Sequence, residues 1–287
     1  MTVGHAQDVA STSIDAMAKH AQAMCQQAYL AGVRHFDVAR SYGRGEMFLR
    51  DWLERRKPTG VTVSTKWGYR YTGNWQTAPE SHEVKEHSLA RLDEQWPESK
   101  ASLGEWLNVF QIHSATLESG VLEDAAVLDR LAWLKRTGLQ IGLTATGPRQ
   151  PEIIRKALTV MRDGAPLFGW VQATWNVLEQ SAGPVLEVAH AAGVKVIVKE
   201  PLANGRLTVR GDTSFNSIAT ASGVTPDALA LACVLAQPWA DVVLMGAATS
   251  EQLVSNLKAR ETAPIDVKRF AVPAETYWAE RAKLAWT

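Results

Sequence analysis

The chain has 287 residues, of which 46% are hydrophobic and 21% are charged. These proportions match ordinary globular proteins and exclude a disordered or fibrous chain. The 30 Lys and Arg residues balance the 30 Asp and Glu residues, so the zero net charge favours neither nucleic acid nor an anionic membrane surface as a partner.

Seven short runs of β-branched and apolar residues are the candidate strands. They cover residues 33–39, 61–67, 108–113, 139–145, 170–175, 194–200 and 241–246. Most are continuous apolar runs and not strict alternations. This is typical of parallel strands that are buried on both faces.

Helical patterns lie between these strands. They cover residues 13–30, 46–56, 79–95, 124–137, 151–161 and 225–236. Thr225 followed by Pro226 is typical of an N-cap and a first helical residue, and residues 249–252 (TSEQ) fit a capping box at the start of a further helix. The chain therefore predicts a strand–helix unit that is repeated several times.

This alternation leaves two α/β architectures, a doubly wound sheet and a (β/α)8 barrel. A doubly wound sheet would have a glycine-rich phosphate turn after its first strand, and the sequence contains neither GxGxxG nor GxxxxGK(S/T). We therefore predict a (β/α)8 TIM barrel that forms a single domain over residues 1–287. An eighth strand has room only near residues 2–5, so we expect an abbreviated first strand.

The cysteines and the N-terminus bear on redox state and location. Cys25 and Cys233 lie far apart, outside any metal-ligand spacing, so we expect packed thiols and no metal site. The first residues lack the basic and apolar regions of a secretory signal, and no window approaches the roughly 20 apolar residues of a membrane span. We expect a cytoplasmic protein.

Four polar residues lie where a barrel places its chemistry, at the C-terminal ends of strands and in the following loops. Asp37, Lys66 and His113 end three predicted strands, and Tyr42 lies in the loop after the first. A lysine cation favours the phenolate of a nearby tyrosine and so lowers its usual pKa of about 10. Asp37 can pair with the buried lysine, and His113 can orient a substrate oxygen.

Such a set suits proton donation to a carbonyl oxygen while a hydride arrives from elsewhere. No side chain can supply a hydride, so the pattern implies a nicotinamide cofactor. Each residue also fits a simpler role when it is taken alone. Asp37 and Lys66 fit a buried structural ion pair, and His113 fits a core histidine.

At these residues the sequence resembles the aldo-keto reductase superfamily. The matching segments are HFDVARSYGRGE at 35–46, VSTKWG at 63–68, FQIHS at 110–114, WVQATWN at 170–176, KEPLANGRL at 199–207 and MGAATSEQLVSNLKA at 245–259. The resemblance implies a (β/α)8 barrel that carries out NADPH-linked reduction of an aldehyde or ketone, or the reverse oxidation. It also implies a tetrad with Tyr42 as acid–base, Lys66 and Asp37 as its support, and His113 as the residue that orients the carbonyl. The N-terminal hairpin usual in the family is absent.

The resemblance also assigns the cofactor and substrate positions. Cofactor contacts are expected at Thr144, Gln172, Trp175, Lys199, Pro201, Leu202, Arg206, Gly246, Thr249, Gln252 and Asn256. The aromatic residues Trp67, Tyr69 and Trp75 after Lys66 are expected to line a pocket for a small carbonyl or alcohol substrate. We expect NADP(H) in preference to NAD(H).

The chain departs from the family pattern at several of these positions. Thr144 and Ala145 replace a Ser-Asn pair, Lys199 replaces a stacking aromatic residue, and Gly246 and Gln252 replace two cations that usually hold the 2′-phosphate. The last change weakens the case for NADP(H). Two other functions stay open: a Schiff-base lyase that uses Lys66 or Lys199, and a nicotinamide-sensing module without turnover. The physiological substrate and the oligomeric state have no signature in the sequence.

Overall fold

The computed structural model describes residues 13–72, 83–211 and 213–284. Its internal contacts group the described residues into two compact units. The first unit comprises residues up to 145 together with 155–171, and the second comprises 146–154 together with residues from 172 onwards. The expectation of a single domain over the whole chain stays a prediction.

Four parallel strands form the centre of the first unit. They are β1 (His35–Asp37), β2 (Thr62–Trp67), β5 (Leu107–Ala115) and β6 (Gln140–Ala145), and each pairs with the next. Val63, Phe110, Ile112, Ile141 and Leu143 on these strands are fully buried. The continuous apolar runs predicted from the sequence are therefore buried strands.

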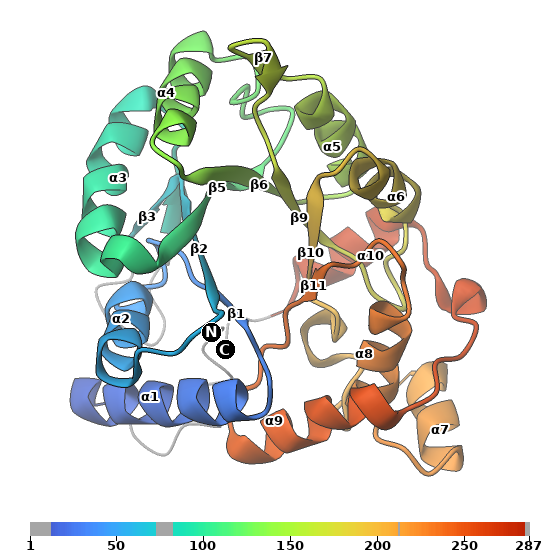
Figure 1. Cartoon of the computed structure of the whole chain (residues 1–287). Helices are drawn as coiled ribbons and strands as arrows, with labels where there is room; N and C mark the ends of the chain where they lie inside the picture. The colour runs from blue at the N-terminus through green and yellow to red at the C-terminus, as the bar shows by residue number, and fades with distance from the viewer. Residues whose placement is uncertain (1–12, 73–82, 212, 285–287) are drawn as a thin grey trace. The chain divides into compact units, whose positions relative to one another are not determined.

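Helices α1 (Ile14–Leu30), α2 (Gly45–Arg56), α3 (Leu89–Leu103) and α4 (Ala125–Arg136) follow one another alongside these strands (Figure 1). Ser13, Ser88 and Asp124 cap α1, α3 and α4 by accepting a backbone N–H bond with the side chain. Trp52 of α2 packs on Phe36 of β1, with 4.8 Å between the ring centroids. Packing against apolar strands and side-chain capping together account for these helices.

Two short hairpins interrupt this pattern in the first unit. β3 (Tyr69–Tyr71) pairs antiparallel with β4 (Glu83–Lys85), and β7 (Met161–Arg162) pairs with β8 (Ala165–Pro166). The helix predicted over 79–95 is therefore wrong at its start, since residues 83–85 form a strand and α3 begins only at Leu89. The reason is that the helical spacing of apolar residues begins only after the Ser88 cap.

The second unit contains the last strands and helices. These are β10 (Lys195–Lys199), β11 (Val242–Val243), α6 (Gly183–Ala191), α7 (Ser214–Ala221), α8 (Pro226–Leu235), α9 (Ser250–Leu257) and α10 (Ala274–Arg281). β9 (Trp170–Thr174) and α5 (Gln150–Leu158) run from one unit into the other. In Figure 1, α8 lies beside α7 and α9.

β11 is much shorter than the strand predicted at 241–246. The carboxylate of Asp241 accepts a hydrogen bond from the backbone N–H of Val196 (2.9 Å) and pairs with Lys195 (2.8 Å). Because that side chain takes a backbone donor of β10, regular pairing begins one residue later, at Val242.

Among the described residues, the main sheet has seven strands in the order β1-β2-β5-β6-β9-β10-β11, which is the order along the chain. Sequential strands with helices between them are the arrangement of a (β/α)8 barrel. The predicted strand near residues 2–5 lies outside the described residues.

No single helix within 13–72, 83–211 and 213–284 has the length and apolar content to cross a membrane. The helices α7 and α8 reach that standard only when taken together, and the chain bends by 99° between them.

Candidate active site

The structure brings together the four residues expected to form the tetrad, all in the first unit. Lys66, on β2, forms an ion pair with Asp37 at the end of β1 and donates to the carbonyl oxygen of Val38 (2.8 Å). Its Nζ lies 5.2 Å from the centroid of the Tyr42 ring. The Tyr42 ring meets the His113 ring edge to face, with 5.7 Å between centroids.

The loop that carries Tyr42 is held along β2 by its backbone. The N–H of Val38 donates to the carbonyl oxygen of Ser64 (2.9 Å), and the N–H of Arg40 donates to that of Lys66 (3.0 Å). Parallel pairing with β2 thus continues past the end of β1. It places Tyr42 two residues beyond the point where the chain still contacts the Lys66 backbone.

The ion pair is buried, and both partners are charged. Lys66 is 2% exposed. Burial is the largest single influence and disfavours its ammonium, but the charge and hydrogen bond of Asp37 together with Tyr42 and Glu83 outweigh burial and raise the pKa of Lys66. Burial likewise opposes the charged form of Asp37, while Lys66 and the hydroxyl of Ser64 hold the pKa of this carboxyl below its usual range.

A hydrogen-bonded chain extends from Asp37 into the interior of the sheet. Ser64 Oγ donates to Asp37 Oδ1 (2.5 Å), and Gln111 Nε2 donates to the same oxygen (3.2 Å). His35 Nε2 lies 2.9 Å from Ser64 Oγ. The hydroxyl proton is used on Asp37, so His35 must be the donor to Ser64. Burial also lowers the pKa of His35, which keeps it neutral.

Sequence reasoning assigned no role to His35, Ser64 or Gln111. All three lie on barrel strands, and the side chains of alternate residues on a strand share a face. His35 and Ser64 each lie two residues before a member of the ion pair. That spacing is the signal that could have found them.

A second group of side chains surrounds His113. The carbonyl oxygen of His113 lies 2.7 Å from Nε2 of His87, and the ring of Tyr69 lies 4.7 Å from the His113 ring. Burial lowers the pKa of His87 to about 4, so His87 is neutral at physiological pH and its Nε2 donates. Gly68, at φ +110°, leaves no room for a side chain, because a Cβ would lie 2.4 Å from His87.

The pocket residues predicted from the sequence have different environments. Trp67 is fully buried and its ring lies 5.9 Å from that of His87. Tyr69 is half-buried against His113. Trp75 lies outside the described residues.

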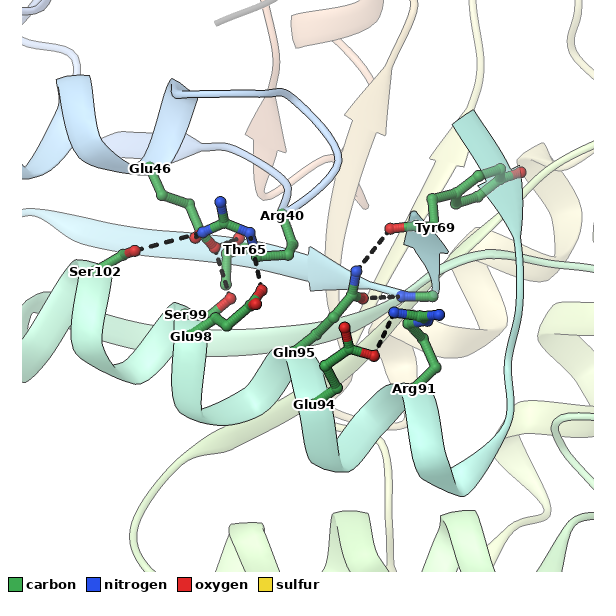
Figure 2. Close-up of polar contacts among 11 residues, drawn as sticks. Arg40, Glu46, Thr65, Tyr69, Arg91, Glu94, Gln95, Glu98, Ser99 and Ser102 are labelled. Carbon is green, nitrogen blue, oxygen red and sulfur yellow. Dashed lines mark hydrogen bonds and ion pairs between the residues drawn. The ribbon is translucent and has the colours of Figure 1, made fainter. Parts of the chain in front are cut away.

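Figure 2 shows polar side chains of α3 that contact Glu46, Arg40 and the segment after β2. Buried Glu46 accepts hydrogen bonds from Thr65 (2.7 Å) and Ser99 (2.7 Å) and pairs with Arg40. Its carboxylate therefore links α2 and the β1–α2 loop to β2 and α3. None of these contacts was expected from the sequence, where Glu46 appeared only as part of a motif.

Gln95 of α3 holds the segment after β2 in a similar way (Figure 2). It accepts from the N–H of Gly68 (2.9 Å) and donates to the carbonyl oxygen of Tyr69 (2.7 Å). The Tyr69 ring is thereby fixed against His113.

A hollow of about 330 Å³ lies between α3 and the β1–α2 loop. Its lining includes Arg40, Arg91, Glu94 and Glu98. Arg40 pairs with Glu98 (3.4 Å) and Arg91 pairs with Glu94. Arg44 and Arg70 also line the hollow. Because Arg40 and Arg91 pair with glutamates of α3 and no tetrad residue lines the hollow, it is an ion-paired seam between two elements and is distinct from the tetrad.

One residue expected to bind the cofactor, Thr144, lies in the first unit. Thr144 is 1% exposed, and its Oγ1 accepts from the N–H of Ser114 (2.6 Å). Ser114 has φ 54°, which is unusual for a residue other than glycine. Thr144 thus secures a strained residue directly after His113.

The other expected cofactor residues lie in the second unit: Gln172, Trp175, Lys199, Pro201, Leu202, Arg206, Gly246, Thr249, Gln252 and Asn256. Gln172, Trp175 and Asn256 are buried, and Trp175 packs edge to face on Trp239. Lys199 Nζ lies 6.0 Å from the ring centroid of Trp278.

Only half of the predicted capping box forms at the start of α9. Thr249 accepts from the N–H of Gln252 (3.2 Å), as expected. The side chain of Gln252 accepts from the N–H of Ala248 (2.7 Å), one residue before the expected position. Thr249 and Gln252 therefore each still accept a backbone N–H at the start of α9.

An ion pair that the sequence did not indicate holds the end of β10. Arg281 of α10 contacts both carboxylate oxygens of Glu200, with Nε 3.0 Å from each. Burial opposes the charge on Glu200, but Lys199 and Arg281 hold its pKa below the usual range. Arg206 pairs with Glu280 of the same helix (3.0 Å).

Comparisons with known proteins agree with this geometry. The model of the Aldo/keto reductase family matches residues 10–272. The chain is 24% identical over 294 residues to the L-glyceraldehyde 3-phosphate reductase of Escherichia coli strain K12, covering 87% of this chain and 81% of the relative.

Solved structures show the same fold. Aldo-keto reductase AKR11C1 from Bacillus halodurans, in its holo form, aligns with a TM-score of 0.69 at 17% identity and covers 99% of this chain and 93% of its own. PA4992 from Pseudomonas aeruginosa, also described as an aldo-keto reductase, aligns with a TM-score of 0.63 at 21% identity, covering 93% and 84%. The protein therefore belongs to the aldo/keto reductase family of oxidoreductases and has its (β/α)8 barrel fold.

Proposed function

We propose that this protein is an NAD(P)H-dependent oxidoreductase. It interconverts an aldehyde or ketone and the corresponding alcohol, or a sugar lactone and the corresponding lactol. The observation that carries the proposal is the convergence of Tyr42, His113 and the Lys66–Asp37 ion pair in the first unit. The name of the Escherichia coli relatives, L-glyceraldehyde 3-phosphate reductase, supports a small carbonyl substrate.

Tyr42 gives its proton to the carbonyl oxygen in the direction of reduction. The charged Lys66, 5.2 Å from its ring, stabilises the phenolate that remains. Asp37 keeps the ammonium charged and in position, and His113 donates a hydrogen bond that orients the same oxygen. A nicotinamide, when bound, would supply the hydride for the carbonyl carbon.

The second unit has side chains suited to a dinucleotide. Arg206 lies over the ring of Tyr277 and pairs with Glu280 (3.0 Å). A guanidinium has five N–H donors, which suit phosphate oxygens. The N-terminus of α9, capped by Thr249, adds backbone donors for an anion. We propose NADP(H) as the bound form, as the family resemblance implies.

Two measurements test the proposal. Tyr42→Phe should lower kcat for aldehyde reduction by at least about 100-fold and leave the Kd for NADPH within about twofold. Parallel fluorescence titrations with NADPH and NADH should show tighter binding of NADPH, and Arg206→Met should weaken it. Reduction at the parent rate by Tyr42→Phe would show that another group is the acid.

The alternative functions have less support. A Schiff-base lyase needs a neutral lysine, and the ion pair with Asp37 keeps Lys66 charged. A nicotinamide sensor without turnover does not need a proton donor, whereas Tyr42 lies beside both Lys66 and His113.

A further inference from the structure

We propose that Lys85 is a binding site for an anionic group on the carbonyl substrate, so that the preferred substrates are short aldehydes that carry a phosphate. This inference rests on the proposed function, because it names the substrate class of the same site.

The hairpin turns one face towards His113. Residues that pair across two strands have side chains on the same face, and the register pairs Tyr69 with Lys85 and Arg70 with Val84. Tyr69, whose ring contacts the His113 ring, defines the inward face. Lys85 shares that face and is half-buried, while Arg70 and Val84 share the other face and are exposed.

The Lys85 ammonium lies next to the catalytic strand end. Its Nζ donates to the carbonyl oxygen of Ser114 (2.9 Å), the residue after His113. The same Nζ lies 5.5 Å from the centroid of the Tyr69 ring. Lys85 and His113 therefore both contact Tyr69, and a short substrate held by His113 extends along the edge of this ring towards the ammonium.

The charge on Lys85 is incompletely balanced. The charges of Glu118 and Glu83 act on it and favour the ammonium, but its recorded contacts in the described residues are to a carbonyl oxygen and an aromatic ring and not to a carboxylate. Burial lowers its pKa, which means that the ammonium has lost part of its hydration. An ammonium has three donors, and within the described part of the chain only the bond to Ser114 is made. A phosphate would supply the missing charge and acceptors.

The site differs from the ion-paired seam between α3 and the β1–α2 loop. There, Arg40 and Arg91 already form ion pairs with glutamates of α3. At Lys85 the cation contacts a neutral carbonyl oxygen and an aromatic ring. Arg40 and Arg91 are thus already paired with carboxylates, whereas the contacts of Lys85 are to neutral groups.

The test compares glyceraldehyde 3-phosphate with glyceraldehyde, which differ by the phosphate. Parent protein should prefer the phosphorylated aldehyde in kcat/KM. Lys85→Met should lower kcat/KM for it by about 10- to 100-fold, the range expected for a lost hydrogen bond between charged groups, and leave glyceraldehyde within about twofold. Lys85→Arg should keep most of the preference. Arg70→Met removes a charge from the opposite face of the same hairpin and should change neither substrate.

Binding of glycerol 3-phosphate, measured by calorimetry, gives a readout independent of turnover. It should bind the parent and Lys85→Arg proteins and bind Lys85→Met at least about 10-fold more weakly. Equal binding to the parent and Lys85→Met, no binding to the parent, or an equal loss of both aldehydes in Lys85→Met would refute the site. If Tyr42→Phe abolishes reduction while Lys85→Met leaves the preference unchanged, only this inference fails and the proposed function stands.

Discussion

Replacing Ser64 with alanine removes a hydrogen bond that the Ser64 hydroxyl donates to the carboxylate of Asp37. Ser64 is fully buried, and its hydroxyl donates to Asp37 Oδ1 and accepts from His35. A bond to a charged acceptor contributes about 1.5–3 kcal/mol, and a buried donor left without an acceptor costs about 1–3 kcal/mol. Because these effects share atoms and do not add fully, we expect Ser64→Ala to lower the free energy of unfolding by about 2–4 kcal/mol.

The loss should depend on pH with a definite sign. Burial raises the pKa of Asp37, but Lys66 and Ser64 lower it by more, so its folded value lies below the unfolded value of about 3.9. Such a group stabilises the fold above its unfolded pKa, and this stability is lost as pH falls through the folded pKa. The difference between parent and Ser64→Ala should therefore be complete at pH 7 and shrink only as pH falls below the unfolded value of about 3.9, towards the lower pKa of Asp37 in the folded protein.

The assays are denaturant unfolding at several pH values and kcat/KM for aldehyde reduction. A less firmly held Asp37 should misplace Lys66, and we expect kcat/KM to fall about 10-fold. Ser99→Ala is the matched control, since it removes an equally buried hydroxyl that donates to the carboxylate of Glu46. It should lower stability and leave kcat/KM within about twofold. Equal losses of activity in both variants, or none in Ser64→Ala, would refute the role given to Ser64.

Three further changes test supporting contacts. Glu46→Gln leaves the guanidinium of Arg40 without its buried partner and should destabilise the protein by about 3 kcal/mol in denaturant unfolding. Gly68→Ala places a Cβ 2.4 Å from His87 at a positive φ, so the melting temperature should fall, whereas alanine at Gly120, where nothing lies within 4 Å, should cost only about 1–2 kcal/mol. Arg281→Met strands the buried carboxylate of Glu200 and should cost about 3–5 kcal/mol at pH 7, with the loss shrinking in acid as that carboxyl is protonated.

The strands and most helices could be predicted because burial leaves a mark on the sequence. A parallel strand covered on both faces is rich in apolar and β-branched residues, so runs such as 61–67 and 139–145 can be recognised without knowing their partner strands. The β3–β4 hairpin leaves no such mark. Its strands are three residues long, and the inward face of β4 carries Glu83 and Lys85. Only pairing with Tyr69 and Tyr71 makes those residues a strand.

The proximity of the tetrad could be predicted for a geometric reason. The C-terminal ends of neighbouring parallel strands lie at the same edge of a sheet, so Asp37, Lys66 and His113 had to approach one another. Contacts made by helices could not be predicted in this way. Glu46 and Gln95 hold the loop and strand ends from α2 and α3, and which helical residue reaches a given strand depends on packing that the sequence does not display.

Polar residues in the barrel interior form hydrogen bonds with the carboxylate of Asp37 or with one another. The interior of a barrel is normally filled by branched apolar side chains, yet His35, Ser64 and Gln111 occupy it next to Asp37. Burying unpaired polar groups is unfavourable. These residues are stabilised there because His35 bonds to Ser64, and Ser64 and Gln111 each donate to the carboxylate of Asp37. An apolar residue in place of Asp37 would leave Ser64 and Gln111 without this acceptor, and apolar residues in place of Ser64 and Gln111 would remove two hydrogen bonds from the carboxylate. The ion pair beside Tyr42 and the polar interior therefore depend on each other, which is why stability and turnover should change together when Ser64 is altered.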